Sequence, residues 1–343
     1  MKQLLFIFLC CANVIAVANT DSSSIYLQLG QQALQAKEYN KAELHLKNAI
    51  RLQPNNIQPK LLLATVYNAT NKLYPAIQQY KAVIEKENLN KEALSKLATL
   101  TFANFNYADA ITYAIKCQQL SIGTKTNYIL AKSYYKLEDY KNSSKYLQAA
   151  AAEDPKNADI PYTMANIWVN SNNAKQAAAM YEVVFSIDST KPAYYIEAAD
   201  LYNDLGNSTK ELYCYERAIG LGATTDLSLQ TTVGMAYLNA EKYKRGMEIL
   251  NKVIAKKPMD KELYNQIAYV FYEKKQYADA INMWDKIIQI DKSEVRTLYM
   301  IGMAFQKNGD EAKGKKLCEI AIAKDPSLKN MKKEMPTPQS MGL

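Results

Sequence analysis

Residues 23–56 read SSIYLQLGQQALQAKEYNKAELHLKNAIRLQPNN, and this stretch decides the fold. Small residues stand at Gly30 and Ala42, twelve positions apart. A side chain larger than a methyl at either place would hold two short antiparallel helices apart, so both positions predict a close helix–helix contact. Pro54 cannot continue a helix and predicts the end of the second one. The stretch is therefore interpreted as a helical hairpin.

The same pattern returns along the chain with a period of 34 residues, the signature of a repeat architecture. The first small residue recurs nine times, at Gly30, Ala64, Ala98, Ala131, Ala165, Ala199, Gly234, Ala268 and Gly302. The second small position holds Ala42, Ala76, Ala110, Ser143, Ala177, Gly246, Ala280 and Gly314, with Glu211 as the exception. Apolar residues at helical spacing follow in each copy. The repeat predicts stacked helix pairs and no strands.

The spacing divides the chain into an array at 19–328 and two terminal segments. We place the copies at about 23–56, 57–90, 91–123, 124–157, 158–191, 192–226, 227–260, 261–294 and 295–328. The sixth copy matches least well, and its packing is expected to be looser because Glu211 replaces a small residue. Residues 329–343 are expected to form a short capping helix, which covers the end of the last pair, and a disordered tail.

With this phasing the chain resembles the tetratricopeptide repeat family. The resemblance rests on the 34-residue period, small residues at the eighth and twentieth positions, an aromatic near the eleventh, alanine near the twenty-seventh and proline near the thirty-second. It covers residues 23–328. It implies an all-α fold, a right-handed superhelical solenoid of antiparallel helix pairs. It also implies a non-catalytic scaffold that binds other proteins.

The first residues are typical of a secretory signal. Lys2 supplies the positive charge, residues 4–17 the apolar segment, and Ala16 and Ala18 the small residues of a cleavage site. The apolar run is shorter than the roughly 18 to 20 residues that span a bilayer. We expect residues 1–18 to be cleaved near Ala18, which leaves no transmembrane segment. The protein is then exported, periplasmic or secreted, like exported bacterial-type members of the family.

Composition and charge favour a packed protein without a nucleic-acid site. The 343 residues are 48% hydrophobic and 22% charged, which suffices to bury a core. The formal net charge is +8, but no run of Lys and Arg is long enough to suggest a nucleic-acid groove. No nucleic-acid partner is therefore expected.

No catalytic, cofactor-binding or metal-binding residues are predicted, and no cofactor is expected. The single histidine, His45, is expected to face outward, and no glycine-rich phosphate loop is present. After signal cleavage Cys117, Cys214 and Cys318 remain, each about a hundred residues from the next. In an array whose copies touch only their neighbours, these cysteines cannot meet within disulfide range. They are predicted to be free thiols, with Cys117 and Cys318 on packed helix faces.

In the resembling family the first helix of each pair lines the concave side, where ligands lie. Carrying over the second, fifth, ninth, twelfth and thirteenth positions predicts a partner-binding groove with Phe102, Lys125, Tyr128, Lys132, Tyr135, Tyr162, Asn166, Asp200, Asn265, Tyr269, Tyr272 and Tyr299, and with Lys136, Asp204 and Arg296 nearby. Rings and amides on a rigid surface suit an extended peptide. The lysines, followed by aspartates, are expected to orient a polar partner. Because the chain holds 26 tyrosines, some of these rings are expected to pack against neighbouring helices instead.

Two function classes stay open on these residues. The first is a protein-binding scaffold of the cell envelope, and the second is a carbohydrate or cell-wall binding protein in which Tyr128 and Tyr162 stack on sugar rings. Binding of glycans in the presence of competing peptides would separate them. The Lys and Asn pattern that clamps a carboxylate in some members is not found, since the fifth positions of the middle copies are Tyr128, Tyr162 and Ile196. The partner and the oligomeric state are left open.

Overall fold

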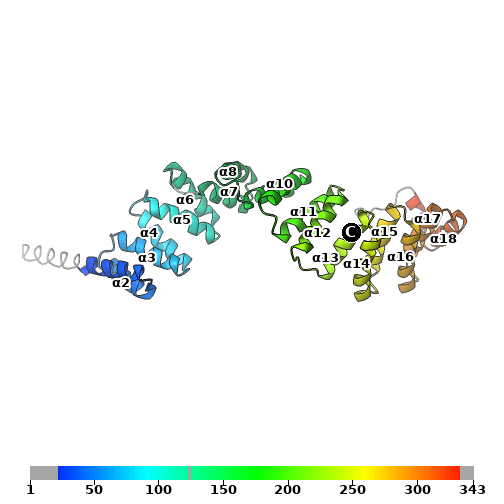
Figure 1. Ribbon diagram of the computed structural model, residues 1–343, viewed down its shortest axis with the longest axis horizontal. Coiled ribbons are helices and arrows are strands. Elements are labelled where there is room, and N and C mark those ends of the chain that lie inside the picture. Colours follow the sequence, from blue (N-terminus) through cyan, green and yellow to red (C-terminus); the bar gives the residue numbers. More distant parts are fainter. Residues whose placement is uncertain (1–21, 123–124, 333–343) are drawn as a thin grey trace, which may run out of the picture. The chain divides into compact units, whose positions relative to one another are not determined.

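The computed structural model describes residues 22–122 and 125–332, and these residues are helical with no strand (Figure 1). A helix at 22–35 comes first. The helices that follow are α2 (Tyr39–Leu52), α3 (Gln58–Ala69), α4 (Leu73–Ile84), α5 (Lys91–Ala103), α6 (Tyr107–Gln119), α7 (Thr126–Lys136), α8 (Tyr140–Glu153), α9 (Asp159–Asn170), α10 (Ala174–Ile187), α11 (Pro192–Asp204), α12 (Ser208–Gly220), α13 (Leu227–Asn239), α14 (Tyr243–Lys256), α15 (Lys261–Glu273), α16 (Tyr277–Ile290), α17 (Val295–Lys307) and α18 (Glu311–Lys324). The 3₁₀ helix η1 (Pro326–Lys332) comes last. The predicted all-α fold is confirmed.

The chain divides between Asn172 and Asn173 into two compact units, called unit 1 and unit 2. In unit 1 the hairpins α3–α4, α5–α6 and α7–α8 pack in chain order, each second helix against the first helix of the next pair. In unit 2 the hairpins α11–α12, α13–α14, α15–α16 and α17–α18 follow in chain order, with α12 against α13, α13 against α15 and α16 against α17. Within each unit, helices near in sequence are therefore the ones in contact, as a solenoid requires.

The small residues lie where paired helices touch. A Cβ atom added to Gly30 would lie 2.7 Å from the Leu46 side chain, and one added to Gly314 would lie 2.5 Å from the carbonyl oxygen of Gly302. Such contacts are far inside van der Waals range, and Ala42 and Ala280 are fully buried at equivalent positions. The close approach predicted from the spacing is confirmed at these pairs.

A recurring turn closes the hairpins. The N–H of Lys72 donates to the carbonyl of Tyr67 over 2.8 Å, and the residue between the helices, Asn71, is left-handed with φ 56°. The same turn brings Phe105 to φ 60° and Gly309 to φ 95°. It is a Schellman ending, which satisfies helix C-terminal carbonyls and reverses the chain. The residue three positions after the first small residue of a copy supplies the carbonyl acceptor of this turn, as Tyr67, Thr101 and Phe305 show.

The sixth pair accommodates Glu211 without the expected loosening. The Glu211 side chain is only 4% exposed, and Ala199 and Ala218 beside it in the α11–α12 hairpin stay fully buried. Burial raises the pKa of Glu211 to about 7, and the nearby Asp200 charge acts in the same direction. The pair therefore keeps a closed core around an ionisable group.

Cys117, Cys214 and Cys318 form no disulfide among the described residues, as predicted, and all three are buried, whereas burial was predicted for Cys117 and Cys318 only. The expectation for His45 is wrong. Its ring is half-buried and stacks on Tyr26 at 6.1 Å, and its Nδ1 atom is buried without a hydrogen-bond partner among the described residues.

The end of the array is covered by η1 rather than by an α-helix. Leu328 is 3% exposed and packs in one cluster with Tyr299, Cys318 and Ala321. Asp325 caps the turn, since its Oδ1 accepts from the N–H of Ser327 at 3.0 Å. The predicted signal at 1–18 and the predicted tail beyond 332 lie outside the described residues. Within residues 22–122 and 125–332, the structure holds no helix with the length and apolarity needed to cross a bilayer.

Candidate functional site

In unit 1, helices α7 and α9 bring together a polar cluster that the sequence predicted only in part. The Nζ atom of Lys132 lies 2.8 Å from Oδ2 of Asp159 and donates to Oγ1 of Thr163 over 3.1 Å. The Tyr128 hydroxyl donates to the same Asp159 oxygen over 2.7 Å. The Lys132 side chain is 15% exposed. The predicted basic character of the groove at Lys132 is therefore wrong, because Asp159 compensates this charge.

Three other predicted residues of the fourth copy, Tyr135, Lys136 and Lys125, lie on α7 or at its N-cap. The Nζ atoms of Lys132 and Lys136 lie 5.9 and 5.8 Å from the centroid of the Tyr135 ring, a cation–π arrangement. Lys125 is exposed at the N-cap of α7 with φ 69°, and it lines a cavity of about 390 Å³ with Tyr128. The walls of that cavity also include Glu153 and Asp154, so Lys125 shares its lining with two carboxylates.

Three further predicted groove residues of unit 1 lie on α5 and α9. Phe102 packs edge-on against Tyr107, with ring centroids 6.0 Å apart, and contributes to the core around α5. Tyr162 and Asn166 are half-buried on α9. The aromatic surface predicted for copies three to five is thus partly absorbed into helix packing.

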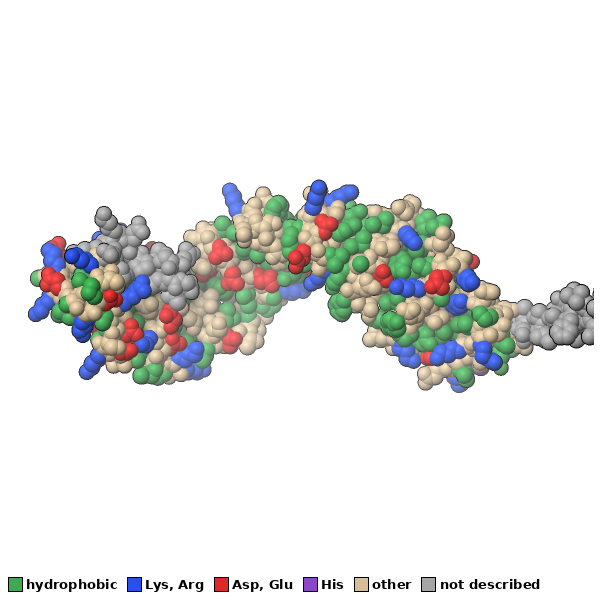
Figure 2. All heavy atoms as spheres, turned by 180° about the vertical axis from the view of Figure 1, so that it is seen from behind, with side chains coloured by type: hydrophobic (Ala, Val, Ile, Leu, Met, Phe, Trp, Pro, Cys, Tyr) green, Lys and Arg blue, Asp and Glu red, His purple; other side chains and the backbone are tan. Residues whose placement is uncertain are grey.

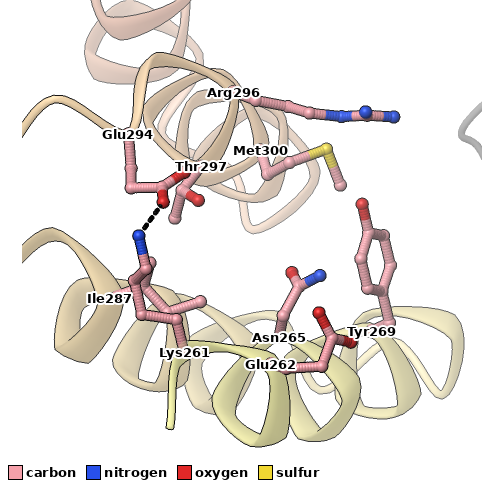
Figure 3. Close-up of a pocket in the computed structure, with 9 residues that line it drawn as sticks. All are labelled: Lys261, Glu262, Asn265, Tyr269, Ile287, Glu294, Arg296, Thr297 and Met300. Atoms are coloured by element: carbon pink, nitrogen blue, oxygen red, sulfur yellow. Dashed lines mark hydrogen bonds and ion pairs between the residues drawn. The ribbon is translucent and has the colours of Figure 1, made fainter. Parts of the chain in front are cut away.

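In unit 2, a cavity of about 480 Å³ lies between α15 and α17, the first helices of neighbouring pairs (Figure 3). Its lining consists of Lys261, Glu262, Asn265, Tyr269, Ile287, Glu294, Arg296, Thr297 and Met300. We call it the α15–α17 pocket. It contains two residues of the predicted groove, Asn265 and Tyr269, together with Arg296.

An ion-pair network closes one side of the α15–α17 pocket. The Nζ atom of Lys261 pairs with Glu294 and lies 3.0 Å from Oδ2 of Asp291. Hydrogen bonds from Ser293 and the Lys261 charge lower the pKa of Asp291 to about 2. The Lys261 charge is therefore already compensated by two carboxylates.

Trp284 on α16 fixes the orientation of the Asn265 amide, which lines the pocket. The indole Nε1 of Trp284 donates to Oδ1 of Asn265 over 3.0 Å, and Trp284 is fully buried. Because an indole can only donate, the Asn265 oxygen must face it, which turns the Nδ2 amino group away from it. Figure 3 shows the Asn265 side chain rising from α15 into the pocket between Lys261 and Tyr269.

The opposite wall is aromatic and cationic. Tyr269 stands edge-on to Trp284, with ring centroids 5.5 Å apart, and is 3% exposed. Burial raises the pKa of its hydroxyl, and the Arg296 charge opposes this shift. The Arg296 side chain is exposed and extends across the open side of the pocket, above Met300 in Figure 3.

The remaining predicted residues of unit 2 lie elsewhere. Tyr272 packs against Tyr277 at 5.2 Å and against Trp284 at 5.8 Å. The prediction that Tyr299 lies in the groove is wrong, because it is 1% exposed inside the cluster of Leu328 and its buried hydroxyl has no hydrogen-bond partner in the described part of the chain. Asp200 is exposed and accepts from the Tyr215 hydroxyl over 2.7 Å.

The sequence interpretation missed a set of buried second-helix aromatics whose polar ends reach first-helix residues. These contacts are Tyr80 with Thr65 at 3.5 Å, Tyr181 to Glu197 at 2.6 Å, Tyr215 to Asp200 at 2.7 Å and Trp284 to Asn265 at 3.0 Å. Their recurrence at the repeat spacing was a visible signal. Helical spacing alone predicts only an apolar packed face at these positions.

Charged side chains of both signs are mixed on the surface. On the face shown in Figure 2, Lys and Arg side chains lie among Asp and Glu side chains in both units. Among the described residues, no group of three or more His, Cys, Asp and Glu side chains is placed to hold a metal ion.

Two family models, both described as tetratricopeptide repeat, match residues 134–207 and 296–327. These two segments are therefore similar to tetratricopeptide repeats, a class of helix-pair repeat whose stacked arrays form extended binding surfaces. The second match includes α17, one wall of the α15–α17 pocket.

The chain is also similar to the BBSome complex member BBS4 of Bos taurus, with 23% identity over 201 residues. That similarity covers 57% of this chain and 38% of the relative, so the chain spans well under half of that protein's length. Among solved structures, YrrB, a TPR protein with an unusual peptide-binding site, is 18% identical, with 52% of this chain and 92% of YrrB covered at a TM-score of 0.38. The C-terminal part of a TPR repeat-containing protein from Cytophaga hutchinsonii is 19% identical, with 71% and 97% covered at a TM-score of 0.44.

Proposed function

We propose that this protein is a non-catalytic scaffold that binds a partner protein on the surface formed by the first helices of its hairpins. In unit 2 the partner enters the α15–α17 pocket as an extended segment. The signal predicted at 1–18 supports export, and so the partner is expected to be a periplasmic or secreted protein.

The observation that carries this proposal is the α15–α17 pocket itself. Its volume of about 480 Å³ is within the usual range of ligand sites. From α15 it offers the donor group of Asn265, the exposed carboxylate of Glu262 and the ring of Tyr269. An extended peptide alternates carbonyl and N–H groups, so a wall with both donors and acceptors can bond its main chain.

The pocket is also preorganised, which lowers the entropic cost of binding. Trp284 and Tyr269 are almost fully buried and lock each other edge-to-face. Lys261 is held by Asp291 and Glu294 on the opposite side. A partner segment therefore meets side chains that are already in place.

Site-specific photo-crosslinking in the native compartment tests the proposal. A photoreactive residue replaces the exposed Glu262 on α15, and the matched control carries it at Lys286, which is exposed on α16 and does not line the pocket. We expect a protein adduct at position 262 and none at position 286. The captured partner should bind the purified protein, and a peptide from the crosslinked segment should compete.

Other outcomes count against the proposal. Equal labelling at both positions would indicate a surface contact unrelated to the pocket. An adduct with a polysaccharide that peptides do not displace would favour the carbohydrate-binding alternative, in which aromatic rings stack on sugars.

A further inference from the structure

We propose that the α15–α17 pocket binds a main-chain carbonyl of an extended peptide through the Asn265 amino group, and that the buried Trp284 is the positioning residue that sets this polarity. The inference rests on the proposed function, because it specifies how the same pocket holds its partner.

The polarity follows from the chemistry of one hydrogen bond. An asparagine amide can present either its oxygen or its nitrogen on a given side. Here the Trp284 Nε1–H lies 3.0 Å from Oδ1 of Asn265, and a rotated amide would set two donors against each other. Among the described residues, none accepts a hydrogen bond from the Asn265 Nδ2 group. The pocket therefore receives a fixed donor that needs an acceptor from the ligand.

The charges of the pocket favour a neutral acceptor over a carboxylate. Arg296 contributes a positive charge to the lining, but Glu262 lies on the same lining. Lys261 is already paired with Glu294 and Asp291. An acidic side chain of the ligand would gain little net attraction and would approach Glu262. A peptide carbonyl accepts from Asn265 without this cost, and the next N–H of the peptide can donate to Glu262.

The sixth pair provides an internal contrast to this arrangement. Tyr215 on α12 occupies the place in its hairpin that Trp284 occupies on α16, and its hydroxyl donates to Asp200. The exposed Asp200 carboxylate keeps acceptor capacity for a ligand. A hydrogen bond from a second-helix aromatic residue thus leaves a hydrogen-bond acceptor at Asp200 and a hydrogen-bond donor at Asn265. The second-helix aromatic and its first-helix partner together decide which kind of group each surface can bind.

The experiment uses the full chain and a phage-displayed library of random 12-residue peptides as the probe. Selected peptides are resynthesised with a fluorophore, and their affinity is measured by fluorescence anisotropy. Each peptide is also made with single main-chain amides replaced by esters, a change that weakens the carbonyl as an acceptor. Variants Asn265→Asp and Trp284→Phe are compared with Asn282→Asp, which makes the same amide-to-acid change at an exposed position of α16 outside the pocket lining.

We expect Asn265→Asp to weaken peptide binding at least tenfold, because its second oxygen faces the peptide carbonyl while the first still accepts from Trp284. Trp284→Phe should weaken binding three- to tenfold, because Asn265 is then no longer oriented. Asn282→Asp should leave affinity unchanged. At one position of the peptide, replacing the main-chain amide by an ester should lower affinity for the wild type but not for Asn265→Asp. A purely structural role of Asn265 and Trp284 would not produce this difference.

The inference and the proposed function fail in different ways. If peptides bind and Asn265→Asp binds them as tightly as the wild type, the carbonyl assignment is overturned while peptide binding stands. If only acidic peptides are selected and their amide counterparts do not bind, the carbonyl assignment is overturned and the pocket recognises a carboxylate. If no peptide is enriched on the wild type, both are overturned. Circular dichroism checks that each variant is folded. If Trp284→Phe does not fold, the result for Asn265→Asp alone tests the carbonyl assignment.

Discussion

The Nζ atom of Lys132 on α7 lies 2.8 Å from Oδ2 of Asp159 on α9, so an ion pair joins the first helices of two successive hairpins. Asp159 also accepts from the Tyr128 hydroxyl. A surface predicted to be basic is thus a polar cluster in which Asp159 compensates the charge of Lys132. The same contacts also hold α7 against α9.

Asp159→Asn should destabilise unit 1, because the half-buried Lys132 would lose its counter-charge. We expect a loss of about 1 to 2 kcal/mol in the free energy of unfolding, more than an exposed pair contributes. Thermal unfolding followed by circular dichroism measures it. The control Glu311→Gln breaks the exposed pair with Lys315 and should change stability by less than about 0.5 kcal/mol. Equal effects of the two variants would contradict the role of Asp159.

Gly314→Ala should destabilise the last hairpin, although alanine favours helix. The new Cβ would lie 2.5 Å from the carbonyl oxygen of Gly302, so α17 and α18 must separate. Such overpacking costs about 1 to 3 kcal/mol. Replacing glycine by alanine gains about 1 kcal/mol of helix propensity, so the net effect is destabilising when the overpacking cost exceeds that gain. Gly220→Ala in α12 is the control, because a Cβ there meets nothing within 4 Å. Chemical denaturation should show a lower midpoint for the first variant alone.

Glu211 should make unit 2 less stable as the pH rises. Its pKa is raised from 4.5 to about 7 in the folded chain, so folding favours the protonated form. The stability that this group supports is fully present below about pH 4.5 and is lost as the pH rises through about 7. Unfolding midpoints measured from pH 5 to pH 8 should fall for the wild type. They should fall less for Glu211→Gln, and an identical slope in both proteins would refute the assignment.

The cysteines of the described structure should resist thiol reagents until the helix pairs open. Burial raises the pKa of Cys214 to about 12 and also raises that of Cys117, so little thiolate is present near neutral pH. With a chain that begins at residue 19, we expect negligible reaction with a disulfide reagent at pH 8 and three reactive thiols after denaturation. Rapid reaction of one thiol in the native protein would show that its helix pair opens locally.

The sequence was sufficient for the fold because its signals are local. A helix pair needs small residues at its contact, apolar residues at helical spacing and a chain break, and each of these lies within one 34-residue copy. Gly30 and Gly314 show that the small residues have the role expected of them. The placement of Asn265, Tyr269 and Arg296 around one pocket also followed from the repeat register.

By itself, then, the sequence determined an all-helical chain of paired helices and the set of first-helix positions from which a binding surface is built. Only the tertiary structure decided the chemistry of that surface. Asp159 neutralises Lys132, Trp284 turns the amide of Asn265, and Tyr299 is withdrawn into the core. Each depends on which side chains of other helices come within about 3 to 4 Å, and a repeat register cannot specify such distances because equivalent positions carry different side chains in each copy.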